Sequence, residues 1–415
     1  MGIIWSLCSW NNNLYDFESI VAIKNKKYMA TLNIRNIGPI KDIHLELKRY
    51  NFFIGPQSSG KSTIAKIISN CLWMEKEIAV HPNKHNDMQY YESIFISQLE
   101  NFHNMHGYFD NQSAFLSYES DYVKIVFENK SCRIQLGNRI KSYERTKILY
   151  IPAERNVLVF ANNFNGDNNI DSFAFDWLNA RDFYQRDSRF EILKLGLEYY
   201  QEQRNGKSIS RIKSDEGDYD IQLTDASSGL QSVVPIATAV EFYTTVFYRT
   251  NIENKLLTAW QEKDRVEIKN FLTDELKKNE TEKNKKAVTN RMERLLNTKR
   301  TSFVIEEPES NLYPTTQRDL LNFIIKSSCV RGRKNKVTIT THSPYIINQL
   351  NLLLKACDKG KKIDGAAIDF DELNVYAIQN GCIRDLKVQN EGVHLIDTDM
   401  LSDDINDTYD LYEQL

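Results

Sequence analysis

Residues 55–63 have the composition and spacing of a phosphate-binding loop. They follow the apolar run 52–54 and precede a stretch with helical periodicity, 64–68. Glycine at two positions lets the backbone direct its N–H groups at phosphate oxygens, and the first turn of a helix adds the positive end of its dipole. The sequence therefore predicts a site for a nucleoside triphosphate, with these phosphate-binding residues: Gly55, Pro56, Gln57, Ser58, Ser59, Gly60, Lys61, Ser62 and Thr63.

Two residues of this loop have distinct chemical tasks. The Lys61 ammonium is expected to reach the β- and γ-phosphates, and the Ser62 hydroxyl is expected to bind Mg²⁺. A second metal ligand is predicted from residues 303–307, where an apolar strand ends in two adjacent carboxylates. Because neighbouring side chains of a strand point to opposite sides, Glu306 can hold the Mg²⁺ shell while Glu307 takes a proton from the attacking water.

Two further segments complete the set of candidate site residues. His342 lies two positions after the strand-like run 337–340, where it would contact the γ-phosphate or the attacking water. Ser227 and Gly229 belong to a short turn before an apolar helical stretch, 233–247. Such a turn at a helix N-terminus binds anions, but it lies too far along the chain to form a second nucleotide site by itself.

The composition is typical of a globular protein that works in a reducing compartment. The 415 residues are 41% hydrophobic and 26% charged, and the formal net charge is −3, so the chain as a whole is not a polycation. Its six cysteines are scattered, without the close pairs of a disulfide framework or a zinc site. The longest apolar-leaning run without charges, 226–240, is too short to span a bilayer. We therefore expect a cytoplasmic protein with no membrane contact.

The order of strand-like and helix-like patterns predicts an α/β fold. Two alternating segments separated by the turn 36–39 form an antiparallel lead-in to the phosphate loop. Residues 86–215 are expected to form a helical arm or insertion. Residues 251–299 contain no Pro or Gly and many charged residues, which favours a second, basic helical insertion. We expect residues 1–28 to be an N-terminal extension and 29–415 to be one domain with these two insertions.

Together, the phosphate loop, the anion-binding turn, the paired carboxylates and His342 resemble the ATP-binding-cassette (ABC) class of ATPases, which uses these motifs in the same order. Two departures, Leu230 in the turn and Glu306 in place of aspartate, resemble the soluble branch with RecF-like and overcoming-lysogenisation-defect-like ATPases. The resemblance implies an ABC-type head that binds ATP and Mg²⁺ and hydrolyses ATP, with Lys61, Glu307 and His342 as catalytic residues.

In the ABC class, the turn of one subunit closes on the ATP held by another subunit. The resemblance therefore implies a dimer or higher homo-oligomer, in which Ser227 and Gly229 contact the nucleotide of the partner chain. Lys61 and Ser227 are only 166 positions apart, which leaves no room for the long coiled-coil arm found in other members of this branch.

The chain also resembles the stand-alone ATPase subunits of bacterial anti-phage systems, such as the two-gene system PARIS, partly through residues 148–155, a strand that runs into a loop. This resemblance implies a sensor or regulatory ATPase that holds or activates a separate effector, either a Toprim nuclease or a toxin. Only 73 residues follow His342, too few for a Toprim domain in that stretch. The alternative function is that of a RecF-like DNA-repair ATPase, which clamps DNA when ATP closes the dimer.

Two features leave alternatives open. Arg155 could approach the nucleotide or form a structural salt bridge. The stretch 277–300 holds nine Lys or Arg against three Glu. It forms either a solvated helical face or a surface for an acidic partner, such as DNA or a phage trigger protein.

Overall fold

A large mixed β-sheet forms the centre of the molecule. The computed structural model describes residues 30–160, 168–217, 219–249, 252–256, 259–330, 332–390, 392–401 and 410–414, and the expected extension 1–28 lies outside them. In this part of the chain the sheet has eleven strands in the order β6-β5-β4-β1-β2-β15-β14-β3-β13-β12-β7. Its strands are β1 (Ala30–Ile37), β2 (Ile40–Leu47), β3 (Tyr50–Ile54), β4 (Phe115–Glu119), β5 (Val123–Glu128), β6 (Ser131–Leu136), β7 (Thr146–Ile151), β12 (Arg300–Glu306), β13 (Lys336–Thr341), β14 (Leu373–Gln379) and β15 (Cys382–Asp385).

The antiparallel lead-in has the form that the sequence predicts. β1 and β2 pair in antiparallel register along their length. The turn between them contains Gly38, whose φ of 52° lies in the left-handed region, and a Cβ there would lie 2.3 Å from Cδ1 of Tyr108. The predicted α/β fold class is confirmed, because strands form one large sheet and helices pack on it.

Five neighbouring strands at the centre of the sheet run parallel. β14, β3, β13, β12 and β7 pair in parallel register, so that Phe52 lies between Val375 and Ile339. Parallel strands end at the same edge of a sheet, and ligands of α/β proteins bind at that edge. The carboxyl ends of β3, β12 and β13 lead into the phosphate loop, the paired carboxylates and His342. The topology therefore brings most of the candidate site residues to one edge.

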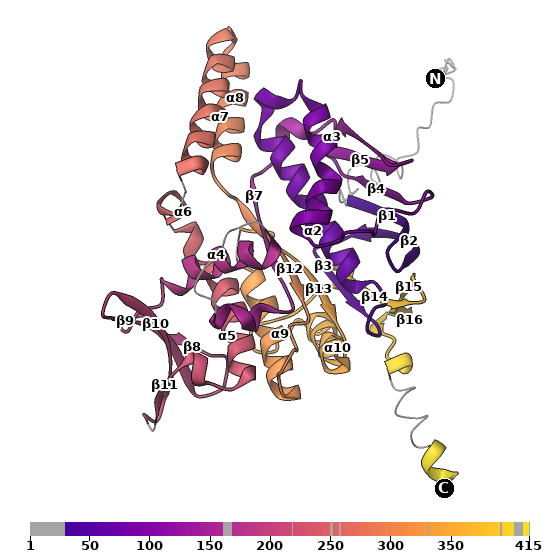
Figure 1. Cartoon of the computed structure of the whole chain (residues 1–415), viewed down its shortest axis with the longest axis vertical. Helices are drawn as coiled ribbons and strands as arrows, with labels where there is room; N and C mark the ends of the chain where they lie inside the picture. The colour runs from indigo at the N-terminus through magenta and orange to yellow at the C-terminus, as the bar shows by residue number, and fades with distance from the viewer. Residues whose placement is uncertain are drawn as a thin grey trace, which may run out of the picture.

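Helices cover both faces of this sheet (Figure 1). The helices are α2 (Lys61–Val80) and α3 (Met88–Ser97) on one face, and α4 (Asn169–Arg181), α5 (Ser228–Thr244), α9 (Pro314–Ser328) and α10 (Pro344–Asp358) on the other. Alternate residues of β3 serve the two cores: Phe53 packs with the first set of helices, and Phe52 and Ile54 pack with the second. This burial on both faces explains why residues 52–54 are apolar without alternation.

Residues 86–215 do not form the expected helical arm, because their strands join the sheets. β4, β5 and β6 extend the large sheet beyond β1, and β7 is its other edge. A separate small sheet contains β8 (Phe190–Glu191), β9 (Leu197–Arg204), β10 (Lys207–Ser214) and β11 (Asp220–Gln222). Aromatic residues of this region, such as Tyr118 and Trp177, are buried in the two cores. Because these residues are buried on different faces of the sheet, the sequence of this region shows no single hydrophobic periodicity.

The charged stretch 251–299 forms helices, in agreement with its composition. These are α6 (Ile252–Lys255), α7 (Ala259–Lys278) and α8 (Glu282–Leu296). The last two pack against each other as a hairpin that projects from the sheet (Figure 1). The Thr281 hydroxyl caps α8 by accepting a hydrogen bond from the Asn284 N–H at 3.3 Å. Ile268 of α7 and Leu295 of α8 are buried in the same core as α2.

A buried pair fastens this hairpin to the phosphate-loop helix. His81 directly follows α2, and its Nε2 lies 2.7 Å from Oδ1 of Asp264 on α7. Its Nδ1 lies 2.7 Å from the carbonyl oxygen of Glu77. One helix therefore has the phosphate loop at its first residue and the hairpin contact just after its last.

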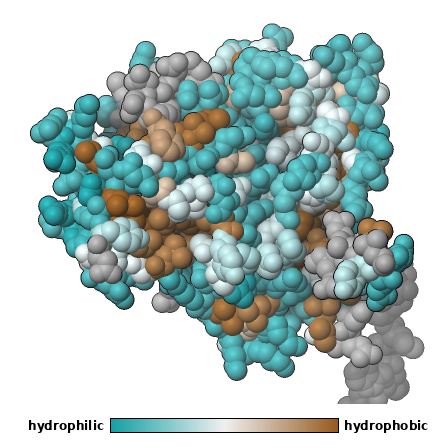
Figure 2. Space-filling model, turned by 60° about the horizontal axis from the view of Figure 1, so that its bottom comes forward, coloured by the Kyte–Doolittle hydropathy of each residue, from teal (hydrophilic) through white to brown (hydrophobic). Residues whose placement is uncertain are grey.

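The remaining strands, β16 (Lys387–Asn390) and β17 (Val393–Ile396), form a two-stranded sheet beside α10. Figure 2 shows apolar residues as separate patches among polar ones on the face that includes the lower end of Figure 1. Within the described residues, no helix is both long enough and apolar enough to cross a membrane.

Candidate nucleotide-binding site

The phosphate loop connects the end of β3 to the start of α2, in the context that the sequence predicts. Gly60 has a φ of 108°, and a Cβ at this position would lie 2.3 Å from Cδ1 of Ile40. A Cβ at Gly55 would lie 2.4 Å from the carbonyl oxygen of Ile378. Neither position accepts a side chain without a shift of its surroundings, so the shape of the loop requires both glycines.

Lys61 is the first residue of α2, and its ammonium lies over the loop. Nζ donates hydrogen bonds to the carbonyl oxygens of Gly55 at 2.9 Å and Pro56 at 2.7 Å, and the residue is 5% exposed. Burial lowers the pKa of Lys61, and the nearby carboxylates oppose this shift, Glu307 most of all. The loop thus holds the ammonium within its own turn, close to the carboxylates.

Two further features of the loop fit a bound triphosphate. Ser62 and Thr63 lie in the first turn of α2, where backbone N–H groups lack partners within the helix. Ser59 Oγ is buried and has no hydrogen-bond partner among the described residues. A buried hydroxyl without a partner is uncommon, and a phosphate oxygen would supply one. The residues present therefore fit ATP.

Glu306 is the last residue of β12 and is 4% exposed. Its Oε1 accepts a hydrogen bond from the hydroxyl of Tyr150, on β7, at 2.6 Å. Burial raises the pKa of Glu306, while the Tyr150 hydrogen bond and the nearby Lys66 lower it. Glu306 and Ser62 would hold Mg²⁺ together with phosphate oxygens and water.

Glu307 and His342 meet across the ends of two neighbouring strands. Nε2 of His342 lies 3.1 Å from Oε1 of Glu307. One residue follows β12 and the other follows β13, and these strands pair in parallel. The backbone of Glu307 has a φ of 42°, a left-handed conformation that is uncommon outside glycine and that clusters at functional sites. The fold thus brings the candidate base beside the candidate histidine.

Glu309 is a residue of this site to which the sequence reasoning gave no role. Its Oε1 accepts a hydrogen bond from the backbone N–H of His342 at 2.6 Å. Its Oε2 is buried and has no partner among the described residues. Burial raises the pKa of Glu309. The sequence signal for this role was the third acid of Glu-Glu-Pro-Glu. In the structure, Glu309 fixes the backbone at His342.

Arg155 takes neither of the two roles considered from the sequence. Its side chain is completely buried, and Nη1 donates to the carbonyl oxygen of Glu306 at 3.0 Å. Nη2 donates to the carbonyl oxygen of Glu307 at 2.9 Å, and Nε donates to that of Ser232 on α5 at 3.1 Å. Burial lowers the pKa of Arg155 to about 10. The guanidinium therefore clamps the backbone that carries the paired carboxylates.

Ser227 and Gly229 lie at the start of α5, in a separate part of the site. Ser227 is exposed, and its Oγ caps the helix by accepting a hydrogen bond from the Leu230 N–H at 3.4 Å. A Cβ at Gly229 would lie 2.9 Å from the carbonyl oxygen of Asn311, in the loop after β12. Among the described residues, no hydrogen bond joins this turn to the phosphate loop. Within one chain, the turn at Ser227 and the phosphate loop are therefore not hydrogen-bonded to each other.

Gln231 supports this turn from inside. Its Nε2 donates hydrogen bonds to the carbonyl oxygens of Leu223 at 3.3 Å, Thr224 at 3.0 Å and Ala226 at 3.0 Å. The residue is buried at 8% exposure. Its amide therefore orders the backbone that presents the exposed Ser227.

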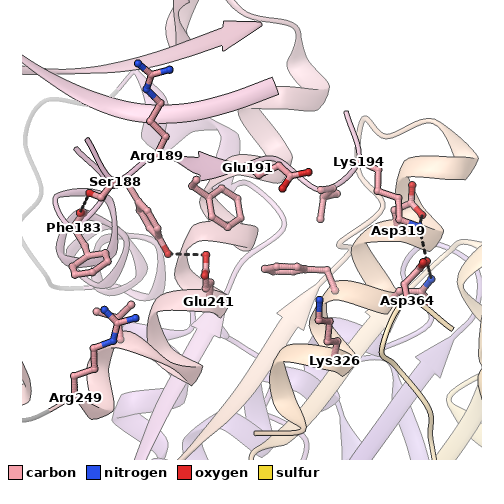
Figure 3. Close-up of a pocket in the computed structure, with 16 residues that line it drawn as sticks. Phe183, Ser188, Arg189, Glu191, Lys194, Glu241, Arg249, Asp319, Lys326 and Asp364 are labelled. Carbon is pink, nitrogen blue, oxygen red and sulfur yellow. Dashed lines mark hydrogen bonds and ion pairs between the residues drawn. The ribbon is translucent and has the colours of Figure 1, made fainter. Parts of the chain in front are cut away.

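A cavity of about 600 Å³ lies between the small sheet, the second half of α5 and α9 (Figure 3). None of the residues that line it belongs to the phosphate loop. In Figure 3 acidic and basic side chains surround aromatic rings, and Lys194 lies beside Asp319 and Asp364. The Tyr184 hydroxyl donates to Oε2 of Glu241 at 3.2 Å, and Nζ of Lys194 lies 2.6 Å from Oδ2 of Asp364. Of these two contacts, only that of Lys194 with Asp364 is an ion pair that neutralises charge within the cavity.

Comparisons with known proteins agree with this site. Residues 294–348, which include β12, the paired carboxylates and His342, match the family described as "AAA domain, putative AbiEii toxin, Type IV TA system". No curated protein sequence matches the chain. The matched segment contains the paired carboxylates and His342 but does not extend to the phosphate loop.

The chain is also similar to several solved structures. An SMC head bound to the C-terminal winged-helix domain of ScpA aligns with 88% of this chain and 98% of its own, at 9% identity and a TM-score of 0.42. The SMC head from Thermotoga maritima aligns with 87% and 99%, at 11% identity and a TM-score of 0.37. The dimeric ATP-binding cassette MJ0796 bound to ADP and phosphate aligns with 86% and 99%, at 12% identity and a TM-score of 0.30.

Proposed function

We propose that the chain hydrolyses ATP in a homodimer or higher homo-oligomer and acts as the sensor or regulatory subunit of a bacterial anti-phage defence system. In this role it works in the cytoplasm and holds or activates a separate effector, such as a Toprim nuclease or a toxin. The name of the matched family, which refers to a toxin–antitoxin system, supports this setting.

One observation carries the proposal of hydrolysis: Nε2 of His342 lies 3.1 Å from the Glu307 carboxylate, beside the loop that holds Lys61. In the proposed reaction, Lys61 binds the phosphates and Glu307 accepts a proton from the attacking water. His342 orients that water or contacts the γ-phosphate. Mg²⁺, when bound, neutralises charge on the phosphates.

The exposed position of Ser227 supports a composite site between two chains. Its hydroxyl is the N-cap of α5, and the free N–H groups of that helix start form a place for an anion. In the proposed dimer, Ser227 and Gly229 of one protomer would close on the γ-phosphate held by Lys61 of its partner. ATP would then join the protomers, and hydrolysis would release them.

The variant Glu307→Gln tests this proposal directly. It keeps the residues that hold the phosphates but removes the base, so ATP should still bind while turnover falls at least about 100-fold. Sedimentation with ATP and Mg²⁺ should show a stable dimer that wild type forms only transiently. Lys61→Ala is the matched control, because it should lose ATP binding and the dimer together. Turnover near the wild-type rate in Glu307→Gln would overturn the assignment.

The proposed defence role needs a test in cells. The chain would be expressed with and without its neighbouring gene, and phage plaques would be counted. We expect protection only when both genes are present and Glu307 is intact. Protection by the chain alone would contradict a separate effector.

The exposed lysines of α8 favour the DNA-clamping alternative over a purely structural hairpin. Lys283 and Lys286 are exposed and Lys285 is partly exposed on one short stretch of this helix. Arg291, which the basic stretch 277–300 includes, is instead buried and lies 3.1 Å from Glu275 of α7. Duplex DNA that binds the hairpin in an ATP- and salt-dependent way, independent of sequence, would support this alternative.

A further inference from the structure

A second cavity, of about 440 Å³, lies at the amino ends of the parallel strands, and the phosphate loop lies at their carboxyl ends. It is lined by residues at the amino ends of three neighbouring parallel strands. Arg49 directly precedes β3, Arg300 is the first residue of β12, and Lys336 is the first residue of β13. Each of these strands starts with a basic residue in the cavity and ends at the candidate nucleotide site.

Basic groups outnumber acidic groups in this lining. The basic residues are Lys48, Arg49, Arg139, Arg300, Lys334 and Lys336, and the acidic residues are Glu75, Asp121, Asp371 and Glu372. Two of the acids are already used, because Glu372 lies 2.9 Å from Arg49 and Asp121 lies 3.1 Å from Arg139. Nη2 of Arg300 lies 3.5 Å from Glu144, a carboxylate outside the lining. The cavity in Figure 3 differs, because four basic and four acidic residues balance there.

Glu75 does not complete the neutralisation. It is 7% exposed, and its carboxylate accepts hydrogen bonds from the hydroxyls of Tyr118, at 2.9 Å, and Ser120. No basic group of the described residues lies within 4 Å of it. Its charge therefore acts on Lys336 and Arg300 only across a distance.

Lys336 is the group that most needs a partner. The residue is partly buried, and its side-chain Nζ makes no hydrogen bond or ion pair with any other described residue. Burial lowers the pKa of Lys336, and the charge on Glu75 opposes this shift. Lys334, at the exposed side of the cavity, also has no partner among the described residues.

We propose that this cavity is a second anion site, which binds a di- or polyphosphate group through Lys336, Lys334 and Arg300. Several cationic groups around one space fit a multiply charged anion better than a single carboxylate, and the planar guanidinium adds paired hydrogen bonds to phosphate oxygens. The volume lies within the usual range for small-molecule sites, about 300–1,000 Å³. The phosphate groups can come from inorganic pyrophosphate or from a nucleotide.

Equilibrium dialysis of the full-length chain against radiolabelled pyrophosphate tests this site by counting bound ligands. Wild type should bind two per chain, one at the phosphate loop and one in the cavity. Lys61→Ala and Lys336→Met should each lose one, and the double variant should lose both, with at least about a 10-fold weaker affinity at the altered site. Lys124→Met, on β5 outside the cavity, is the matched control and should keep two.

The numbers of bound ligands distinguish a nucleotide from inorganic pyrophosphate as the source of the phosphate groups, and they can also contradict the proposal. Two molecules of ADP per wild-type chain, falling to one in Lys336→Met, would identify a nucleotide as the ligand. One ADP but two pyrophosphates would identify free inorganic phosphates. One pyrophosphate per wild-type chain, or two in Lys336→Met, would overturn the proposal. If Lys336→Met does not fold, the variant Glu75→Gln/Lys336→Met, which removes both charges, replaces it with the same expected counts.

Discussion

The Nη2 atom of Arg155 donates a hydrogen bond to the backbone carbonyl oxygen of Glu307 at 2.9 Å. The N–H of Glu307 donates to the carbonyl oxygen of Thr340 at 2.9 Å, so both sides of this residue are held. A left-handed conformation outside glycine costs about 1–3 kcal/mol, and these hydrogen bonds offset that cost. The direction of the candidate base is therefore set by a guanidinium that is completely buried.

Arg155→Lys should impair turnover far more than ATP binding. Lysine keeps the charge but lacks the three nitrogens of the planar guanidinium that reach the carbonyl oxygens of Ser232, Glu306 and Glu307, so the strand end that carries Glu307 loses its clamp. We expect kcat to fall by about 10- to 100-fold, which corresponds to about 1.4–2.7 kcal/mol in the barrier. The KM for ATP should change by less than about threefold.

Stability measurements complete this prediction. Buried carbonyl oxygens left without donors should lower the free energy of unfolding by about 2–3 kcal/mol, measured by urea denaturation. Arg204→Lys, at an exposed position of β9, is the matched control and should change neither quantity. A wild-type kcat in a folded Arg155→Lys protein would contradict the positioning role.

Ser227→Arg should block closure of the dimer while single chains still bind ATP. Ser227 is exposed, so the chain can accommodate the larger side chain, which would then occupy the place of the partner's phosphate. We expect ATP-dependent dimerisation by Glu307→Gln to disappear when Ser227→Arg is added, as measured by sedimentation. Gly229→Asp is a poorer test, because its Cβ would lie 2.9 Å from the Asn311 carbonyl oxygen of its own chain. Normal closure in Ser227→Arg would refute the composite site.

Tyr150→Phe should shift the pH dependence of Mg²⁺-dependent ATP binding. Burial raises the pKa of Glu306, and the hydrogen bond from Tyr150 lowers it by stabilising the ionised carboxylate. Without that hydroxyl the pKa rises further, so less carboxylate is ionised at a given pH below neutrality. As the pH is lowered, the Mg²⁺ concentration needed for half-saturation should therefore begin to rise at a higher pH in Tyr150→Phe than in wild type.

This profile can be measured with a fluorescent ATP analogue between pH 6 and pH 8. Tyr199→Phe, in the small sheet, is the control and should leave the profile unchanged. A profile of Tyr150→Phe that coincides with wild type would remove Glu306 from the metal site.

Charge reversal on α8 should separate the biological output from hydrolysis. The triple variant Lys283→Glu/Lys285→Glu/Lys286→Glu leaves the catalytic motifs untouched, so basal ATPase activity should stay within about twofold, while phage protection is lost. Lys359→Glu/Lys361→Glu/Lys362→Glu changes the same charge at three exposed positions after α10 and should keep protection. Full protection in the first variant would assign α8 to a solvated face. Arg291 is left unchanged because its reversal would break its buried pair with Glu275.

The phosphate loop, the lead-in strands and the order of the motifs could be predicted because each depends on residues that are close in the sequence. These are local features, namely a glycine spacing, a strand pattern and a helix start, and the structure has each of them at the predicted place. The alternation of Phe52, Phe53 and Ile54 between two cores is consistent with the same local pattern.

The parts that the sequence did not reveal depend on long-range contacts. Arg155 meets Glu307 from 152 positions away, and Tyr150 meets Glu306 from 156 positions away. Neither pair has a spacing that could be recognised from one sequence. Likewise, the strands within 86–215 pair with β1 and β12, and their aromatic residues fill cores on both faces of the sheet, which hid the strand pattern.

The pair between His81 and Asp264 attaches the α7–α8 hairpin to the end of α2 that lies opposite the phosphate loop. A helix of 20 residues is about 30 Å long, at about 1.5 Å per residue. If α2 tilted by about 5° about the end that holds Lys61, its other end would move by about 2.6 Å, close to the length of a hydrogen bond. Because the α7–α8 hairpin is attached at that far end, its tip would move further still. A partner resting on the hairpin would thus sense, as a displacement, whether the phosphates are in place.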